Sequence, residues 1–289
     1  MGWMGSFVEV GDDYGRRGQT SEDRVQGRRR TMPGKEPPRP LRRPLIILVL
    51  FGAVVGYLES ATVVYIRLLY QPIHQRLFPD SAPDDLFPAF SLEQWEREAP
   101  PAARSPVLEA SRETGTVVAV ALVAAVAFPT RRCWAAAFFL VAGVSGWSYY
   151  LGLKALIGWP HTPYDWDLIF MVPVPSAGPV WAALTGYAAM VAVAAWFFWG
   201  EAASRPLHAG FVGWASLLAG TVVTAAPFFW DSRRLMAGDY PGPFQAWLLA
   251  PGLILILLGM TFACRRGRRL GRAKSSDDSV SAAKGLGAV

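Results

Sequence analysis

Long apolar blocks are the feature that most limits what this chain can fold into. The first runs from Leu45 to Val64, and Glu59 is its only charged residue. An α-helix rises about 1.5 Å per residue, so a block of this length can cross a hydrocarbon layer of about 30 Å. The block is too long for the apolar part of a signal peptide and has no clear cleavage site after it. We therefore expect a retained membrane helix.

Similar blocks recur as far as Cys264, and they predict an all-α fold, a polytopic bundle of six transmembrane helices. The composition agrees with this class, because 52% of the residues are hydrophobic and only 17% are charged. The second block reaches spanning length once Ser105 is taken as the N-cap and Pro106 as the first helical residue. The predicted spans are 44–70, 106–128, 134–157, 178–199, 209–230 and 244–264.

The segments between and around these spans have different characters. Residues 1–43 and 265–289 are basic and poor in apolar side chains, which predicts disordered cytoplasmic tails. Met32 offers an alternative start of translation, so the residues before it need not be translated. Residues 71–105 form an acidic outer loop, in which Ser91 and Gln94 predict a capping box that opens a short surface helix through Glu98.

The basic residues predict the orientation in the membrane. Of 28 Lys and Arg residues, 20 lie in the two tails, in the turn at 131–132 or at Arg205. Residues 71–113 instead carry eight acids against four arginines. Since cytoplasmic segments are enriched in Lys and Arg, both ends are expected inside a bacterial cytoplasmic (plasma) membrane. This distribution explains the net charge of +6 without a nucleic-acid partner; the lipid bilayer is the expected partner.

Polar side chains at one membrane depth predict a cluster. Glu59 lies 15 residues after Pro44, which places it about 22 Å along its helix. Counted along their own helices, Glu113, Tyr149 and Tyr150 reach nearly the same level, and Lys154 lies one turn further out. The complete set of candidate residues is Glu59, Glu109, Arg112, Glu113, Tyr149, Tyr150, Lys154, Asp165 and Asp167.

Two interpretations of this cluster remain open. An acid in the membrane costs a few kcal/mol unless it is paired, protonated or facing water. Glu109 and Glu113 lie one helical turn apart with Arg112 between them, so they could bind a cation or relay a proton. Alternatively, Glu59 forms a salt bridge with Arg112 or Lys154 and only joins the helices.

The connection at 158–177 is the most unusual segment of the chain, because it combines acids, aromatic residues and prolines between two apolar blocks. Prolines 173, 175 and 179 prevent a continuous helix, so we expect a partly re-entrant connection that closes the cluster from outside. Asp165 and Asp167 are either turn and cap residues or ligands. In the least favoured interpretation they are the bases of an enzyme that acts on a lipid.

This segment resembles a group of bacterial six-helix integral membrane proteins with no known activity. The residues that carry the resemblance are Gly158-Trp159-Pro160, Trp166-Asp167-Leu168-Ile169-Phe170-Met171-Val172-Pro173-Val174-Pro175 and Gly178-Pro179-Val180. It extends weakly to Gly56-Tyr57-Leu58-Glu59 and to Arg112-Glu113. The expected tryptophan after the second proline is replaced by Ser176. The resemblance implies the architecture alone.

No catalytic motif is present, since the chain lacks a P-loop, an H-E-x-x-H and a G-x-S-x-G sequence. His161 with Asp165 and Asp167 is too loosely spaced to predict a metal site, and Cys133 and Cys264 form no metal-binding pattern. We expect no cofactor and no metal, and an enzyme is less favoured than a non-enzyme.

Two functions fit this pattern. The first is a small carrier, or a proton- or cation-coupled protein, that uses the acidic cluster in the outer leaflet. The second is a non-catalytic subunit or assembly partner of a larger membrane complex, in which an exposed aromatic face at 196–199 binds a protein partner or a second copy. Gly143 and Gly146 predict a helix-packing surface rather than a site.

Overall fold

The computed structural model describes residues 41–81, 86–87, 89–98, 106–171, 174–202 and 210–262. The predicted cytoplasmic tails fall almost entirely outside these residues. Ser105, Arg205 and Cys264 also lie outside them.

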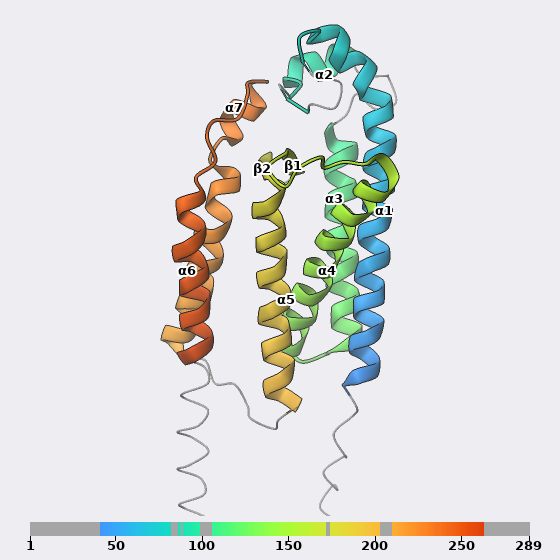
Figure 1. The fold of residues 1–289 in the computed structure, drawn as a ribbon. Coiled ribbons are helices and arrows are strands. Elements are labelled where there is room, and N and C mark those ends of the chain that lie inside the picture. The colour runs from blue at the N-terminus through green and yellow to red at the C-terminus, as the bar shows by residue number, and fades with distance from the viewer. Residues whose placement is uncertain are drawn as a thin grey trace, which may run out of the picture. The chain divides into compact units, whose positions relative to one another are not determined.

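The described chain is mostly helical, which supports the predicted all-α class. Five helices are long and apolar enough to cross a membrane, and the helix Ala246–Phe262 is shorter. This pattern is compatible with a multi-pass membrane protein; the sixth span stays a prediction. The five long helices are α1 (Arg42–Leu77), α3 (Pro106–Ala127), α4 (Arg131–Ile157), α5 (Val180–Ala202) and α6 (Phe211–Phe229). The short helix α7 (Ser232–Met236) follows α6 (Figure 1).

Helix α1 continues to Leu77, seven residues beyond Tyr70, where the predicted first span ends. The apolar block ends at Val64, but Pro72 is accommodated inside the helix and the helix runs on to Leu77. Ring contacts support the extension: the His74 ring lies 5.0 Å from Phe78 and 5.7 Å from Phe90, centroid to centroid. Hydropathy marks where a span leaves the apolar layer, whereas packing decides where the helix stops.

The predicted capping box is confirmed at α2 (Leu92–Glu98). The Ser91 amide donates to Oε1 of Gln94 at 2.9 Å, and the Gln94 amide donates to the Ser91 hydroxyl at 3.3 Å. These reciprocal bonds satisfy two amides that a helix start would otherwise leave unpaired.

The connection before α5 contains a hairpin that the all-α prediction omitted. Strand β1 (Trp166–Phe170) pairs antiparallel with β2 (Ser176–Pro179), and Asp167 lies opposite Gly178. A bulge interrupts the register, and there the Ser176 hydroxyl accepts a hydrogen bond from the Phe170 amide at 3.1 Å. Prolines prevent a helix here, so the backbone groups are satisfied by strand pairing instead.

Helices α1 and α4 make the most extensive contact between described elements. On α1, Gly52, Gly56 and Ser60 are spaced by four residues and are buried, which places them on one face. A Cβ atom on Gly52 would lie 2.9 Å from the backbone oxygen of Val141. Gly152 of α4 in turn lies against the Ser60 side chain. Small residues thus allow the two backbones to approach closely.

The packing role predicted for Gly143 and Gly146 is confirmed. A Cβ on Gly143 would lie 2.8 Å from the carbonyl oxygen of Tyr187, and one on Gly146 would lie 2.5 Å from the Tyr187 ring. These glycines therefore bring α5 against the second side of α4. Helix α4 lies between α1 and α5 (Figure 1).

A second close pair is formed by α6 and the helix Ala246–Phe262. A Cβ atom on Gly220 would lie 2.7 Å from the Gly252 oxygen, and one on Gly259 would lie 2.9 Å from the Gly213 oxygen. This pair meets the hairpin through Phe228 and Phe244, whose rings are 5.3 Å apart beside Gly178.

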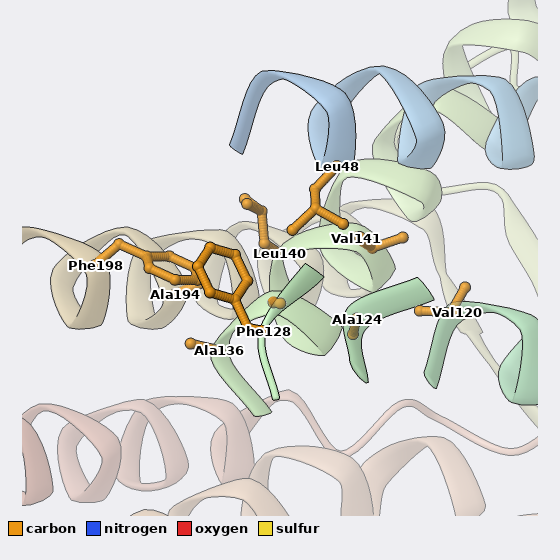
Figure 2. Close-up of a cluster of buried hydrophobic side chains, with 10 residues drawn as sticks. Leu48, Val120, Ala124, Phe128, Ala136, Leu140, Val141, Ala194 and Phe198 are labelled. Carbon is orange, nitrogen blue, oxygen red and sulfur yellow. The ribbon is translucent and has the colours of Figure 1, made fainter. Parts of the chain in front are cut away.

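An apolar core fills the bundle at the end away from the hairpin (Figure 2). Phe128, just after α3, and Phe198 of α5 pack with ring centroids 5.0 Å apart. Phe198 is only 4% exposed, whereas Trp199 is 76% exposed. Phe198 therefore does not belong to the exposed aromatic face predicted at 196–199, because neighbouring residues on a helix point in different directions.

Replacement of Gly56 by Ala tests the α1–α4 contact. The added methyl would collide with the Ser145 backbone and lie 2.8 Å from the Ser148 Cβ, so we expect α1 to move off α4. Overpacking of this kind costs about 1–3 kcal/mol. The thermal unfolding midpoint in detergent should fall.

Gly115→Ala is the matched control, because no heavy atom lies within 4 Å of a Cβ at that helical position. This variant should be as stable as the wild type or slightly more stable. Equal midpoints for Gly56→Ala and Gly115→Ala would contradict the close contact.

Candidate functional site

A cavity of about 720 Å³ lies among α1, α3 and α4, and its lining also includes β1, two residues of α5, Trp159 and three residues that precede α2. We call it the bundle cavity. Its walls are largely apolar, with a few charged groups. The charged and phenolic lining residues are Glu59, Arg67 and Tyr70 of α1, Glu109, Arg112 and Glu113 of α3, Tyr149 and Tyr150 of α4, Asp167 of β1 and Tyr187 of α5.

Helical periodicity explains how α1 supplies one wall. Glu59, Val63, Arg67, Tyr70 and His74 follow each other at intervals of three or four residues, and all line the cavity. Residues with this spacing share one face of a helix. The α1–α4 contact turns this face toward α3 and α4.

Arg112 joins two carboxylates from two helices. Its Nη1 forms an ion pair with Glu59 of α1, and its Nη2 forms one with Glu109, three residues earlier on α3. The Arg112 Nε also donates to Oε1 of Glu109 at 2.9 Å. The Thr116 hydroxyl donates to Oε1 of Glu59 at 2.7 Å. Glu59 therefore belongs to a salt bridge and also faces the cavity, so both predicted roles are compatible with its position.

Glu113 binds the chain that follows β1. The Met171 amide lies 3.0 Å from both carboxylate oxygens of Glu113. The connection before α5 thus reaches across to α3 and closes one side of the cavity.

Asp167 is the most buried acid in the site, with 2% of its surface exposed. The Tyr149 hydroxyl donates to its Oδ2 at 3.3 Å, and Tyr150 also lies beside this carboxyl. Burial raises the pKa of Asp167 to about 6, although the Arg67 charge and the tyrosine hydrogen bonds act in the opposite direction. This carboxyl can therefore exchange a proton near neutral pH.

Arg67 faces Asp167 without a hydrogen bond between them. Its Nη2 lies 3.9 Å from Oδ1 of Asp167, and its guanidinium carbon lies 4.0 Å above the ring of Trp159. The Nε and Nη2 atoms are buried and have no hydrogen-bond partner among the described residues. The guanidinium is held by stacking and long-range attraction rather than by a close acceptor.

Of the nine predicted site residues, seven line the bundle cavity and Lys154 and Asp165 do not. Lys154 is exposed, and its Nζ donates to the carbonyl oxygens of Gly158 at 2.9 Å and Pro160 at 2.7 Å. It therefore binds carbonyls at and beyond the end of α4. The prediction considered depth but not rotation about the helix axis. Lys154 lies five residues after Tyr149, and five residues turn the side-chain direction by about 140°.

Asp165 has the turn role that was one of its two predicted alternatives. Its carboxylate accepts hydrogen bonds from the His161 amide at 2.7 Å and from the Thr162 hydroxyl at 2.5 Å. Burial alone would raise the pKa of Asp165, but the bonds from Thr162 and His161 outweigh that effect and lower it. The residue stabilises the loop between α4 and β1.

Sequence reasoning missed Arg67, although a signal was available. Arg67 lies within the predicted first span, eight residues after Glu59, and an arginine inside a span is itself a candidate for function. Thr116 and Tyr187 were also missed; they are ordinary helix residues, and only the packing of their helices brings them to the cavity.

No group of three or more His, Cys, Asp or Glu side chains that could hold a metal ion occurs in the described part of the chain. Cys133 is half-buried and free. Comparison with protein families, curated proteins and solved structures gives no match. The geometry of the cavity is therefore the basis for a functional conclusion.

Removal of the Arg112 charge should destabilise the protein more than removal of one of its partners. Arg112→Met leaves the half-buried Glu59 and Glu109 uncompensated. The cost should therefore lie between about 1 kcal/mol for an exposed pair and about 3–5 kcal/mol for a fully buried one. Glu59→Gln should cost less, because the amide oxygen can still accept from Thr116. The measurement is the thermal unfolding midpoint in detergent. The double variant Arg112→Met with Glu59→Gln should regain part of the stability that Arg112→Met loses.

Arg76→Gln is the matched control for this comparison. Arg76 lies on the same helix as Glu59 and pairs with Glu98 at the surface, with 64% of its side chain exposed. Its loss should change stability by no more than about 1 kcal/mol. If Arg112→Met behaves like Arg76→Gln, the network does not hold α1 and α3 together.

The raised pKa of Asp167 predicts a pH dependence of stability. Between about pH 4 and about pH 6 the folded state keeps a proton that the unfolded state has released. The contribution of Asp167 to the free energy of unfolding therefore falls as the pH rises through this range and is constant above it. The stability difference between wild type and Asp167→Asn should change by at most about 1.4 kcal/mol per pH unit. A difference that is flat from pH 4 to pH 7 would contradict the raised pKa.

Proposed function

We propose that this chain is a small proton-coupled carrier of the bacterial cytoplasmic membrane and that the bundle cavity is its substrate site. In this proposal the chain crosses the membrane six times with both ends inside. The hairpin β1–β2 then lies on the outer side, and the cavity lies in the outer half of the bundle.

The charge balance of the cavity carries this proposal. Four carboxylates and two guanidiniums line it: Glu59, Glu109, Glu113 and Asp167 against Arg67 and Arg112. If all were charged, the lining would hold two negative charges in excess between largely apolar walls. Uncompensated charge at membrane depth is costly. Protons or a bound cation must balance the excess, so occupation of the cavity is coupled to their exchange.

The shape of the site also supports a carrier. The cavity volume lies within the range of about 300–1,000 Å³ that is typical of small-molecule sites. Intramembrane acids that face a cavity and pair with arginines are typical of proton and substrate pathways. The alternative of a non-catalytic subunit is less favoured, because Phe198 of the expected partner-binding face is buried in the core.

Thiol labelling tests the carrier proposal without knowledge of the substrate. Thr116 lines the cavity, so Thr116→Cys is placed in a chain whose own cysteines are changed to serine. A carrier exposes its site to each side in turn. We expect an impermeant maleimide to label this cysteine both from outside intact cells and from the cytoplasmic side in inverted vesicles.

Val118→Cys is the control, because Val118 lies on the same helix but does not line the cavity. It should remain unlabelled from both sides. Labelling of Thr116→Cys from neither side, or from one side only, would rule out alternating access.

A further inference from the structure

We propose that Arg67 binds the anionic group of an amphipathic substrate whose apolar body occupies the bundle cavity. The anionic group is a carboxylate or a phosphate. This inference rests on the proposed function and names the class of molecule that the same site would take.

Arg67 has hydrogen-bonding capacity that the described residues do not fill. Its side chain is 13% exposed, yet Nε and Nη2 are buried without a hydrogen-bond partner among the described residues. A buried charged donor without an acceptor carries a large desolvation cost. Nε and one Nη atom of a guanidinium point the same way, and they match the two oxygens of a carboxylate or phosphate.

The neighbouring acid does not supply this acceptor. Asp167 remains 3.9 Å from Nη2, while the Tyr149 hydroxyl donates to its carboxylate from α4. The ring of Trp159 supports one face of the guanidinium. Stacking orients the guanidinium but does not fill the hydrogen-bonding capacity of the Nε and Nη2 edge.

The walls of the bundle cavity favour a ligand with an apolar body. Away from the charged groups, the cavity is lined by side chains such as Val63, Val117, Phe138, Ile169 and Met190. A small hydrophilic anion would lose water against these walls and gain no compensating contact. An amphiphile buries its apolar body there, and this burial contributes about 25 cal/mol of favourable free energy per Å² of apolar surface.

An anion adds to the negative excess of the cavity, so its binding must be linked to proton uptake. Arg67 forms its ion pair with Asp167, and the Asp167 carboxyl also faces Tyr149, Tyr150 and Tyr187. Glu113 of α3 lines the same cavity. Protonation of Asp167 removes the charge that competes with the ligand for Arg67. Affinity for the anion should therefore rise as the pH falls through about 6.

Equilibrium binding to the purified full-length protein in non-ionic detergent tests the inference. The probes are radiolabelled palmitate, lysophosphatidate with a palmitoyl chain, and hexadecanol as the uncharged match. Binding is measured about one pH unit below and above the Asp167 pKa of about 6. We expect at least one of the two anions to bind more tightly than hexadecanol, and to bind more tightly at the lower pH. The preferred anion identifies the headgroup chemistry.

Variants then assign the anion to Arg67. Arg67→Gln should weaken anion binding about tenfold or more and leave hexadecanol binding unchanged, and Arg67→Lys should retain part of the preference. Arg76→Gln, on the same helix, should bind like the wild type. Asp167→Asn keeps Arg67 intact and removes the competing charge. At both pH values its affinity for the anion should therefore equal that of the wild type at the lower pH. This variant tests the role of Arg67 if Arg67→Gln fails to fold.

Three results would overturn the inference: equal binding of the anions and hexadecanol, unchanged anion affinity in folded Arg67→Gln, or binding of no probe. If Thr116→Cys is still labelled from both sides, the carrier proposal survives any of them. If the protein prefers the anion but Thr116→Cys is labelled from neither side, the inferred ligand class is supported and the carrier proposal is contradicted.

Discussion

The close contact between α1 and α4 is the constraint on which the rest of the structure depends. Gly52, Gly56 and Ser60 remove side-chain bulk from one face of α1, so its backbone lies against α4. That contact sets the rotation of α1 and thereby aims Glu59 and Arg67 into one cavity. In a lipid environment, where apolar surfaces gain little from avoiding solvent, such packing is the main source of helix association.

Charge compensation is the second organising principle, and it differs between the two parts of the cavity. Around Arg112, a single guanidinium is shared by Glu59 and Glu109, so charge and hydrogen bonding are both provided by the protein. Around Arg67, the nearest carboxylate is held by tyrosine hydroxyls instead. Charge and hydrogen bonding are therefore satisfied within the protein around Arg112, whereas Nε and Nη2 of Arg67 keep unfilled hydrogen-bonding capacity.

The sequence predicted much of the architecture because its signals are local. Apolar block length gave the helix positions, the Ser91–Gln94 pair gave the start of α2, and prolines excluded a helix before α5. The same signals could not reveal the β1–β2 hairpin, because strand pairing between Asp167 and Gly178 joins residues that are not neighbours in the chain. The end of α1 was also missed, since ring contacts with Phe90 extend it past the apolar block.

For the candidate site, the sequence by itself determined depth: a fixed rise per residue puts Glu59, Glu113 and Tyr149 at one level. The tertiary structure alone decided direction. Near-uniform hydrophobicity removes the amphipathic pattern that orients a soluble helix, so rotation follows from the packing of small residues. For this reason Lys154 points away to the loop carbonyls, while Arg67 joins the cavity.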